Sequence, residues 1–184
     1  MIAEELILVN EKDEPISTME KMEVHQKSLL HRAFSVFIFN QKGEMLLQQR
    51  AINKYHSAGL WTNACCSHPK PGEDTETGAL RRLYEELGFY TPLEKIFDFI
   101  YKSSFENGLT EFEFDHVFAG YYEGLIIPNP DEVYDYCFMS MDEIESSLSV
   151  QPKKFSTWFQ IAFPKVKSWK ENITGKNAGS AEPE

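Results

Sequence analysis

Short apolar runs separated by polar turns mark the first half of the chain. Leu6–Val9 is an apolar run that ends in a polar turn, and it predicts a strand. Phe34–Phe39 is rich in β-branched and aromatic residues, and Met45–Gln49 follows it after a short turn that contains glycine. This pattern predicts a β-hairpin. Trp61–Glu73 is rich in Pro, Gly, Cys and Ser, so we expect no regular structure in it.

An amphipathic helix is the clearest element in the middle of the chain. Asp74 can cap its first turn, and Gly88 can end it in the left-handed conformation that glycine adopts easily. Between these two positions, apolar residues recur at helical spacing, at Ala79, Leu80, Leu83 and Leu87. The pattern therefore predicts a helix between Asp74 and Gly88.

The second half of the chain alternates further strands and helices. We expect two long strands joined by a turn, one more strand, and two closing helices, at Lys95–Phe105, Glu111–Tyr122, Tyr134–Met139, Met141–Val150 and Phe155–Asn172. This order predicts an α+β fold, with a mixed sheet between helices in an α/β/α sandwich. Residues 1–174 are expected to form one domain, and residues 175–184 a disordered tail without large apolar side chains.

The composition is that of a folded domain with an acidic surface. The chain has 184 residues, of which 42% are hydrophobic and 14% aromatic, which is enough for one substantial core. Acidic residues outnumber basic ones by 29 to 18, for a formal net charge of -11. A surface of this sign disfavours nucleic-acid binding, but it leaves room for a small basic pocket that takes a compact anion.

The cysteines and the N-terminus bear on the cellular compartment. Cys65, Cys66 and Cys137 are odd in number and two of them are adjacent, so no disulfide framework is expected. The N-terminus lacks the basic start and apolar run of a signal peptide, and no run of 18 apolar residues suits a membrane span. We therefore expect a cytoplasmic protein with reduced thiols.

Two glutamates alternate with aromatic residues along one predicted strand. Glu111 and Glu113 share one face, and Phe112 and Phe114 share the other, because side chains two residues apart in a strand point the same way. One interpretation is the solvated acidic face of a half-exposed strand. The other is a pair of carboxylates for metal binding or acid–base chemistry, since two close like charges need a cation or a shared proton.

Three histidines could complete such a site. His25, His31 and His68 are separated in sequence, and each by itself is more often a surface or core residue than a ligand. Together with the two glutamates they would supply five nitrogen and oxygen ligands. Imidazole shifts the preference of such a set from magnesium toward manganese, iron or zinc.

One cysteine and four charged residues allow both a structural and a chemical interpretation. Cys66 is either an inert buried thiol or a reactive group whose pKa is set by a nearby metal or base. Arg81 and Arg82 precede Glu85 and Glu86 by four residues on the predicted helix. These pairs are either exposed ion pairs or part of a site for a cation and a phosphate.

Further basic and aromatic residues are equally ambiguous. Lys21, Arg50 and Lys54 are either solvated side chains or a diphosphate clamp, and Tyr101 and Trp158 are either core aromatics or catalytic groups. The residue types by themselves therefore allow a metal, a thiol and an anion pocket, but they determine no reaction.

Several motifs occur in a characteristic order along the chain. They are His31–Phe37, Leu46–Arg50, Thr62–Pro69, Leu80–Gly88, Glu111–Glu113 and Asn129–Val133. Taken together, they resemble the type 1 isopentenyl-diphosphate Δ-isomerases, a family built on the Nudix fold, over about residues 4–170. The resemblance implies a Nudix-like fold, and it implies the conversion of isopentenyl diphosphate into dimethylallyl diphosphate through a carbocation.

The predicted helix departs from the general Nudix box at one informative position. Aligned back from its final glycine, the box is matched at Glu73, Arg81, Glu85 and Glu86, with Ser67 where the box begins with glycine. Arg82 stands where Nudix pyrophosphohydrolases have a glutamate that helps to bind metal. The resemblance implies that the isomerases share this departure and use the arginine for the substrate diphosphate.

Carried over position by position, the resemblance implies a role for each candidate. A divalent ion, Mn²⁺, Zn²⁺ or Mg²⁺, would bind to His25, His31, His68, Glu111 and Glu113. A Mg²⁺ that bridges to the diphosphate would bind to Glu86, and the phosphates to Lys21, Arg50, Lys54 and Arg82. Cys66 and Glu113 would be the acid and base on opposite faces of the isoprenyl carbons, with Tyr101 assisting and Trp158 facing the cation.

Two other functions are compatible with the same motifs. One is a Nudix-type diphosphate hydrolase, against which Arg82 argues; the other is a non-catalytic module that senses a diphosphate, which would need neither Cys66 nor Glu113. The expected partner is a small isoprenoid diphosphate and no nucleic acid. The chain is expected to be a monomer or a homodimer.

Overall fold

A computed structural model describes residues 4–54 and 56–178 of the chain. The strands in this part are β1 (Glu5–Val9), β2 (Pro15–Glu20), β3 (His31–Phe39), β4 (Met45–Arg50), β5 (Trp61–Asn63), β6 (Cys65–Ser67), β7 (Leu93–Ser104), β8 (Thr110–Tyr121) and β9 (Val133–Met139). The helices are α1 (Lys21–Lys27), α2 (Thr75–Leu87), α3 (Met141–Val150), a short 3-10 helix (Pro152–Lys154) and α4 (Thr157–Ala178).

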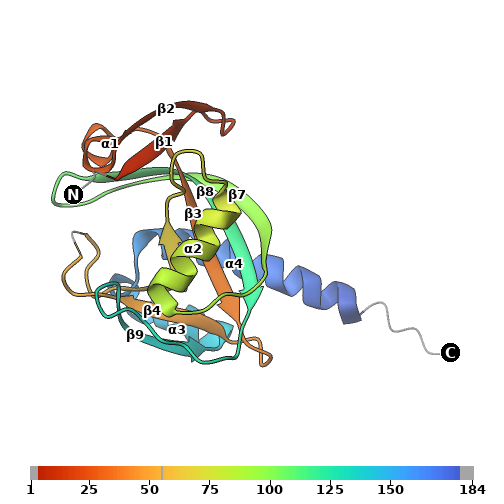
Figure 1. Ribbon diagram of the computed structural model, residues 1–184. Helices are drawn as coiled ribbons and strands as arrows, with labels where there is room; N and C mark the ends of the chain where they lie inside the picture. Colours follow the sequence, from red (N-terminus) through yellow and green to blue (C-terminus); the bar gives the residue numbers. More distant parts are fainter. Residues whose placement is uncertain (1–3, 55, 179–184) are drawn as a thin grey trace.

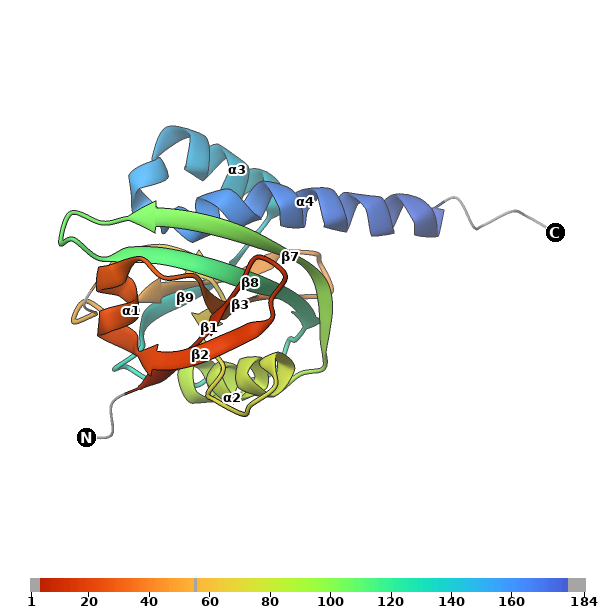
Figure 2. The same cartoon turned by 90° about the horizontal axis from the view of Figure 1, so that it is seen from above.

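The strands form one curled mixed sheet around β3 (Figure 1). β3 pairs in parallel with β8 from His31 opposite Glu113 to Phe39 opposite Tyr121, and β8 pairs in turn with β7. Helix α2 covers one face of the sheet, and α3 and α4 cover the other (Figure 2). The predicted α+β fold with a mixed sheet between helices is therefore confirmed.

The alternation of side chains along β3 divides the interior into two cores. Phe34, Val36 and Ile38 pack with α2 on one face, whereas Phe37 and Phe39 pack with α4 on the other. All five side chains are fully buried or nearly so, because helices cover the strand on both faces. The near-continuous apolar run that predicted the strand is the signature of such a doubly covered position.

The predicted hairpin is confirmed only at its turn, and the prediction of no regular structure in Trp61–Glu73 is wrong over β5 and β6; both outcomes have one reason. β3 and β4 form a hairpin turn but pair only at Phe39 and Met45, after which they separate. The segment expected to be irregular lies between them as β5, which pairs with β4, and β6, which pairs with β3. An interior strand must satisfy its backbone polar groups on both edges, and this short inserted pair of strands does so for β3 and β4.

Other boundaries agree with the predictions more closely. β7, β8 and β9 begin and end within two residues of their expected limits, and α2 lies between Asp74 and Gly88 as predicted. β2 and α1 were not predicted, since α1 is a short helix without a sustained apolar stripe. α4 continues to Ala178, beyond the expected end, and the rest of the expected tail lies outside the described residues.

Among the described residues, no helix has the length and the apolar character that crossing a membrane requires.

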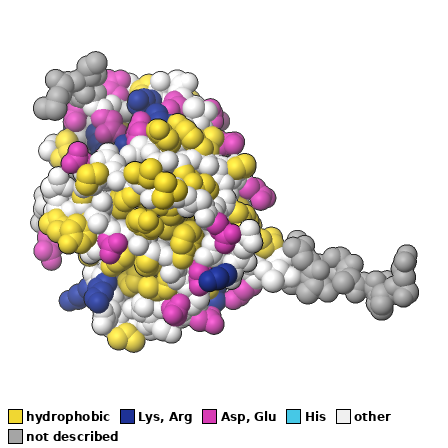
Figure 3. All heavy atoms as spheres, turned by 60° about the horizontal axis from the view of Figure 1, so that its bottom comes forward, with side chains coloured by type: hydrophobic (Ala, Val, Ile, Leu, Met, Phe, Trp, Pro, Cys, Tyr) yellow, Lys and Arg dark blue, Asp and Glu magenta, His cyan; other side chains and the backbone are white. Residues whose placement is uncertain are grey.

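No histidine is visible on the face of the molecule that Figure 3 shows. Apolar side chains gather across the middle of this face, and charged side chains lie around them. The lack of visible histidines fits the burial of all five histidines of the chain, none of which is more than 9% exposed. Histidine is usually intermediate in burial, so five buried rings call for a structural or chemical explanation.

Gly88, which ends α2, provides a test of the packing between this helix and the loop before β9. Its φ is +77°, and an added Cβ would lie 2.6 Å from the carbonyl oxygen of Ile127. We expect Gly88→Ala to cost about 1–2 kcal/mol for the left-handed conformation and about 1–3 kcal/mol more for the clash. Chemical denaturation measures this loss.

Gly72→Ala is the matched control for this prediction. Gly72 also has a positive φ, of +81°, but an added Cβ would meet nothing within 4 Å. Only the conformational cost applies there, so Gly72→Ala should be clearly milder than Gly88→Ala. Equal losses for the two variants would contradict the close packing of α2 against Ile127.

Candidate active site

A polar cavity brings together residues from three helices, α1, α2 and α4, from four strands, β4, β6, β7 and β8, and from the loops between elements. The predicted residues that line it are Lys21, Arg50, Lys54, Cys66, His68, Arg82, Glu86, Tyr101, Glu111, Glu113 and Trp158. The remaining two predicted residues, His25 and His31, are fully buried beside the glutamates. All predicted site residues therefore belong to one constellation, although they come from distant parts of the sequence.

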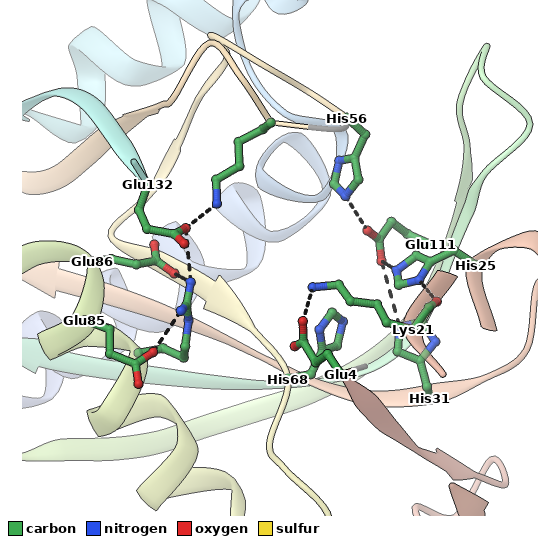
Figure 4. Close-up of polar contacts among 12 residues, drawn as sticks. Glu4, Lys21, His25, His31, His56, His68, Glu85, Glu86, Glu111 and Glu132 are labelled. Atoms are coloured by element: carbon green, nitrogen blue, oxygen red, sulfur yellow. Dashed lines mark hydrogen bonds and ion pairs between the residues drawn. The ribbon is translucent and has the colours of Figure 1, made fainter. Parts of the chain in front are cut away.

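The centre of the site is a buried cluster of imidazoles and carboxylates (Figure 4). Nε2 of His25 lies 3.3 Å from Oε2 of Glu111, and Nε2 of His68 lies 3.1 Å from Oε1 of Glu113. Nε2 of His31 lies between the two carboxylates, 3.9 Å from Glu111 and 3.6 Å from Glu113. The ligand atoms of the three histidines and Glu111 all lie within 4.8 Å of one another.

Backbone carbonyls orient two of these rings from behind. Nδ1 of His25 donates to the carbonyl of Lys21 at 2.6 Å, and Nδ1 of His31 donates to that of Leu29 at 2.9 Å. When Nδ1 carries the proton of a neutral ring, Nε2 has a free lone pair that points into the cluster and can bind a metal ion. Nε2 of His31 is buried without a hydrogen-bond partner among the described residues. This donor set fits a divalent cation.

The acidic face of β8 is not solvated, so that interpretation of its alternating glutamates is wrong. Glu111 is 4% exposed and Glu113 is 8% exposed, because α1 and the segment after β6 cover them. Burial by itself would raise the pKa of Glu113, but hydrogen bonds with His31, Glu111 and Tyr101 and the charge of His31 together lower it below its usual value. Glu113 is therefore a carboxylate at neutral pH.

Hydrogen bonds to Glu113 complete its surroundings. The hydroxyl of Tyr101 donates to Oε2 of Glu113 at 2.6 Å, and burial and the nearby carboxylates raise the pKa of this tyrosine. Burial and the charge of His31 lower the pKa of His68, which keeps its ring neutral. Glu113 is thus ionised beside a protonated phenol and a neutral imidazole.

Cys66 enters the site because β6 pairs with β3 opposite Ser35. Its thiol donates to Oδ1 of Asn63 at 3.1 Å and lies 3.3 Å from Oγ of Ser35, which donates to Oδ2 of Asp115 at 2.7 Å. Burial and the charge of Asp115 raise the pKa of the Cys66 thiol. Cys66 is therefore protonated in a site where Glu113 is ionised.

The adjacent Cys65 points the other way, into the core beneath α2. It is fully buried, and its thiol lies 3.5 Å from Oε1 of Glu86. Burial raises its pKa well above the usual value. Only the second of the two neighbouring cysteines lines the cavity.

Basic side chains also line the cavity. Lys21 lies beside the histidines (Figure 4), and two further cations gather at Glu132. Arg82 pairs with Glu85 and Glu86, each at 2.8 Å, and with Glu132 at 3.1 Å. Glu132 also pairs with Lys54. These ion pairs raise the pKa of Arg82 despite its burial and hold two cations at the cavity wall.

The remaining wall is aromatic. The guanidinium of Arg50 lies 5.2 Å from the centre of the Trp158 ring, at the distance of a cation–π contact. Trp158 is 4% exposed, and the pairing of Tyr101 with Glu113 joins this wall to the cluster of imidazoles and carboxylates. The cavity thus has a basic side, an aromatic side and a floor of imidazoles and carboxylates.

Sequence reasoning missed several residues of the site. Asp115 continues the alternation of Glu111 and Glu113 and could have been found from that spacing. Glu132 lies inside a recognised motif without having been assigned a role. Ser35 sits in an apolar run and His56 in a loop, so no local pattern marks either of them.

Comparison with known proteins defines the class of protein first. Residues 29–159 match the family model of the NUDIX domain. Among solved structures, the chain is similar to DR0079 from Deinococcus radiodurans, with a TM-score of 0.67 at 19% identity over 80% of this chain and 90% of that one. It is also similar to a MutT protein from Methanosarcina mazei Go1, with a TM-score of 0.61 at 24% identity over 78% of this chain and 95% of that one. The molecule is a NUDIX-domain protein.

Relatives at higher identity narrow the assignment. The chain is 48% identical to an isopentenyl-diphosphate Delta-isomerase of Pectobacterium atrosepticum, over 88% of this chain and 90% of that protein. It is 41% identical to isopentenyl-diphosphate Delta-isomerase 2 of Aromatoleum aromaticum, over 96% of this chain and 93% of that protein. The chain belongs to the isopentenyl-diphosphate Delta-isomerase family, as its motifs had implied.

Proposed function

We propose that this chain converts isopentenyl diphosphate into dimethylallyl diphosphate by adding one proton and removing another. The observation that carries the proposal is that a thiol, Cys66, and a carboxylate, Glu113, line the same cavity. The surroundings raise the pKa of the thiol and lower that of the carboxylate. Moving an unactivated double bond requires both an acid and a base, each in the correct protonation state before the reaction starts.

The proton transfers follow from these two states. The Cys66 thiol donates its proton to the terminal methylene carbon, which leaves a tertiary cation at the branched carbon. The Glu113 carboxylate removes a proton from the carbon on the other side of that centre, and the new double bond forms there. The hydroxyl of Tyr101, which donates to Glu113 at 2.6 Å, orients the carboxylate that accepts the proton.

The cation between the two steps needs stabilisation and protection from water. The buried ring of Trp158 lines the cavity and offers an aromatic face for a cation–π contact. The reaction also requires that water, which would trap the cation as an alcohol, be kept from the hydrocarbon end of the substrate. Arg50, already over this ring, would turn to the diphosphate when substrate enters.

Two groups of residues would hold the charged part of the reactants. Lys21, Arg50, Lys54 and Arg82 surround the position proposed for the diphosphate. A divalent ion would be held by His25, His31, His68, Glu111 and Glu113, and Mg²⁺ on the diphosphate by Glu86. When bound, such ions neutralise phosphate charge and lower the pKa of the groups beside them. Mn²⁺, Zn²⁺ and Mg²⁺ are the candidates for the histidine site.

The three free thiols also support a location for the reaction. Cys65, Cys66 and Cys137 are all unpaired, and the proposed acid must stay reduced to act. We therefore assign the activity to the reducing cytoplasm.

A direct assay tests this function. Purified protein with Mg²⁺ and isopentenyl diphosphate should give dimethylallyl diphosphate in an NMR or mass-spectrometric assay, without release of phosphate. A diphosphate hydrolase would instead release phosphate, and a sensing module would bind the substrate unchanged. Either of these results would replace the proposal.

Replacement of the thiol tests the proposed acid. Cys66→Ala should lower kcat by about 10²–10⁴-fold, the usual contribution of a positioned proton donor. Binding of isopentenyl diphosphate, measured by calorimetry, should stay close to that of the unmodified protein, because the thiol acts on the hydrocarbon end. Cys65→Ala, whose side chain points into the core beneath α2, should have a much smaller effect on kcat. A kcat of Cys66→Ala within tenfold of the unmodified protein would exclude the proposed role.

Replacement of Arg82 tests the diphosphate pocket. Arg82→Gln should raise KM for isopentenyl diphosphate at least about tenfold, because charge-assisted hydrogen bonds of about 1.5–3 kcal/mol are lost. Arg81→Gln is the matched control, since Arg81 pairs with Glu73 and Glu85 but does not line the cavity. It should lower the melting temperature with little change in KM. A KM that responds equally to both variants would remove Arg82 from the pocket.

A further inference from the structure

His56 is the one buried histidine at the cavity that the roles above do not use. It lies in the loop between β4 and β5, and it is 9% exposed. Its Nε2 is 3.0 Å from Oε1 of Glu111, a contact drawn in Figure 4. An imidazole at hydrogen-bond distance from a buried metal-binding carboxylate is a strong electrostatic partner for it.

The two oxygens of Glu111 face different histidines. Oε2 is the oxygen nearest to His25 and His31, at 3.3 and 3.9 Å, whereas Oε1 faces His56. His56 is not a member of the group His25, His31, His68 and Glu111 whose ligand atoms converge. It therefore acts on the carboxylate from outside the metal-binding cluster.

Packing fixes the ring of His56 in this orientation. The ring stacks on Phe105 at 4.8 Å with an angle of 11° between the planes, and it meets Trp158 edge-on at 5.9 Å and 88°. Its Nδ1 lies 3.3 Å from the hydroxyl of Ser57, which can donate to it and leave the proton on Nε2. A proton on Nε2 is what a hydrogen bond to the Glu111 carboxylate requires.

The same residue joins the metal-binding cluster to the rest of the cavity. The carbonyl oxygen of His56 accepts from the guanidinium of Arg50 at 3.3 Å, and Arg50 lies over Trp158. Lys54, two residues earlier on this loop, is held by Glu132. The loop therefore connects Glu111 with the aromatic and basic walls.

We propose that His56 is a positioning residue for the metal site: by donating Nε2–H to Oε1 of Glu111, it directs Oε2 of that carboxylate to the metal ion. The proposal rests on the proposed metal-dependent function. It assigns His56 no contact with metal or substrate. Partners that orient a metal-binding side chain in this way change metal affinity by about 10–100-fold when they are removed.

Metal affinity measured on two variants tests the proposal. His56→Ala removes both the ring and the donor, whereas His56→Gln removes the ring but keeps an N–H group that can reach Glu111. Protein stripped of metal is titrated with Mn²⁺ by calorimetry. We expect His56→Ala to bind Mn²⁺ about 10–100-fold more weakly, and His56→Gln to recover most of that loss. Ile52→Ala, an exposed side chain on the same loop, should bind like the unmodified protein.

A spectroscopic measurement separates positioning from direct ligation. The visible absorption of Co²⁺ reports the ligand set, so its shape should be the same in His56→Gln and in the unmodified protein. A changed spectrum would make His56 a ligand and overturn the proposal. Equal weakening by His56→Ala and His56→Gln would overturn it as well, because packing of the ring would then explain the effect.

The failure of this inference is distinguishable from failure of the proposed function. If the unmodified protein binds Mn²⁺ and His56→Ala binds it equally well, only the role of His56 is overturned. If the unmodified protein binds neither Mn²⁺ nor Co²⁺ nor Zn²⁺, the metal site itself is wrong and the role of His56 falls with it, whereas the assay for dimethylallyl diphosphate tests the proposed function separately.

Discussion

The parallel pairing of β3 with β8 is the constraint on which the site depends. It places His31 opposite Glu113, and the alternation of β8 turns Glu111, Glu113 and Asp115 to the same side. A slip of one residue would exchange these acids for the aromatic side chains between them. The helices on both faces make that slip costly, because each strand would then direct polar groups into an apolar core.

This pairing buries a concentration of charge that a purely structural core would avoid. Glu111, Glu113 and Asp115 are all less than 9% exposed, and burial of ions costs several kcal/mol each unless hydrogen bonds and opposite charges compensate. The surroundings shift the pKa values of neighbouring groups in opposite directions. The pKa of Glu113 is lowered, whereas those of Asp115 and Cys66 are raised. Groups held in opposite protonation states within one cavity are typical of proton-transfer sites.

The NUDIX fold supplies the frame for this chemistry, and a few positions adapt it. α2 carries Glu85 and Glu86, and Arg82 on the same helix adds a cation to the cavity wall and is held there by three carboxylates. The strands inserted between β3 and β4 bring Cys66 to the wall of the same cavity. Activity is thus decided by individual side chains on a shared scaffold.

The sequence by itself determined most of the longer elements and the α+β class, and it named the members of the cluster. Local signals sufficed for α2, where a cap, an apolar stripe and a terminal glycine agree within one segment. The motifs of the family, found in the same order along this chain, were enough to name Cys66, Glu113 and the three histidines as candidates, because a matching motif assigns a role to each of its positions.

Only the tertiary structure decided which interpretation of these residues holds. Glu111 and Glu113 alternate with aromatic residues in the sequence whether their face of the strand is solvated or buried. In the structure this face is buried, because α1 packs against β8. The pairing of β6 with β3, the hydrogen bond from Ser35 to Asp115 and the contact of His56 with Glu111 all join residues far apart in the chain. Such contacts leave no local periodicity, since they arise from strand pairing and burial across the whole sheet.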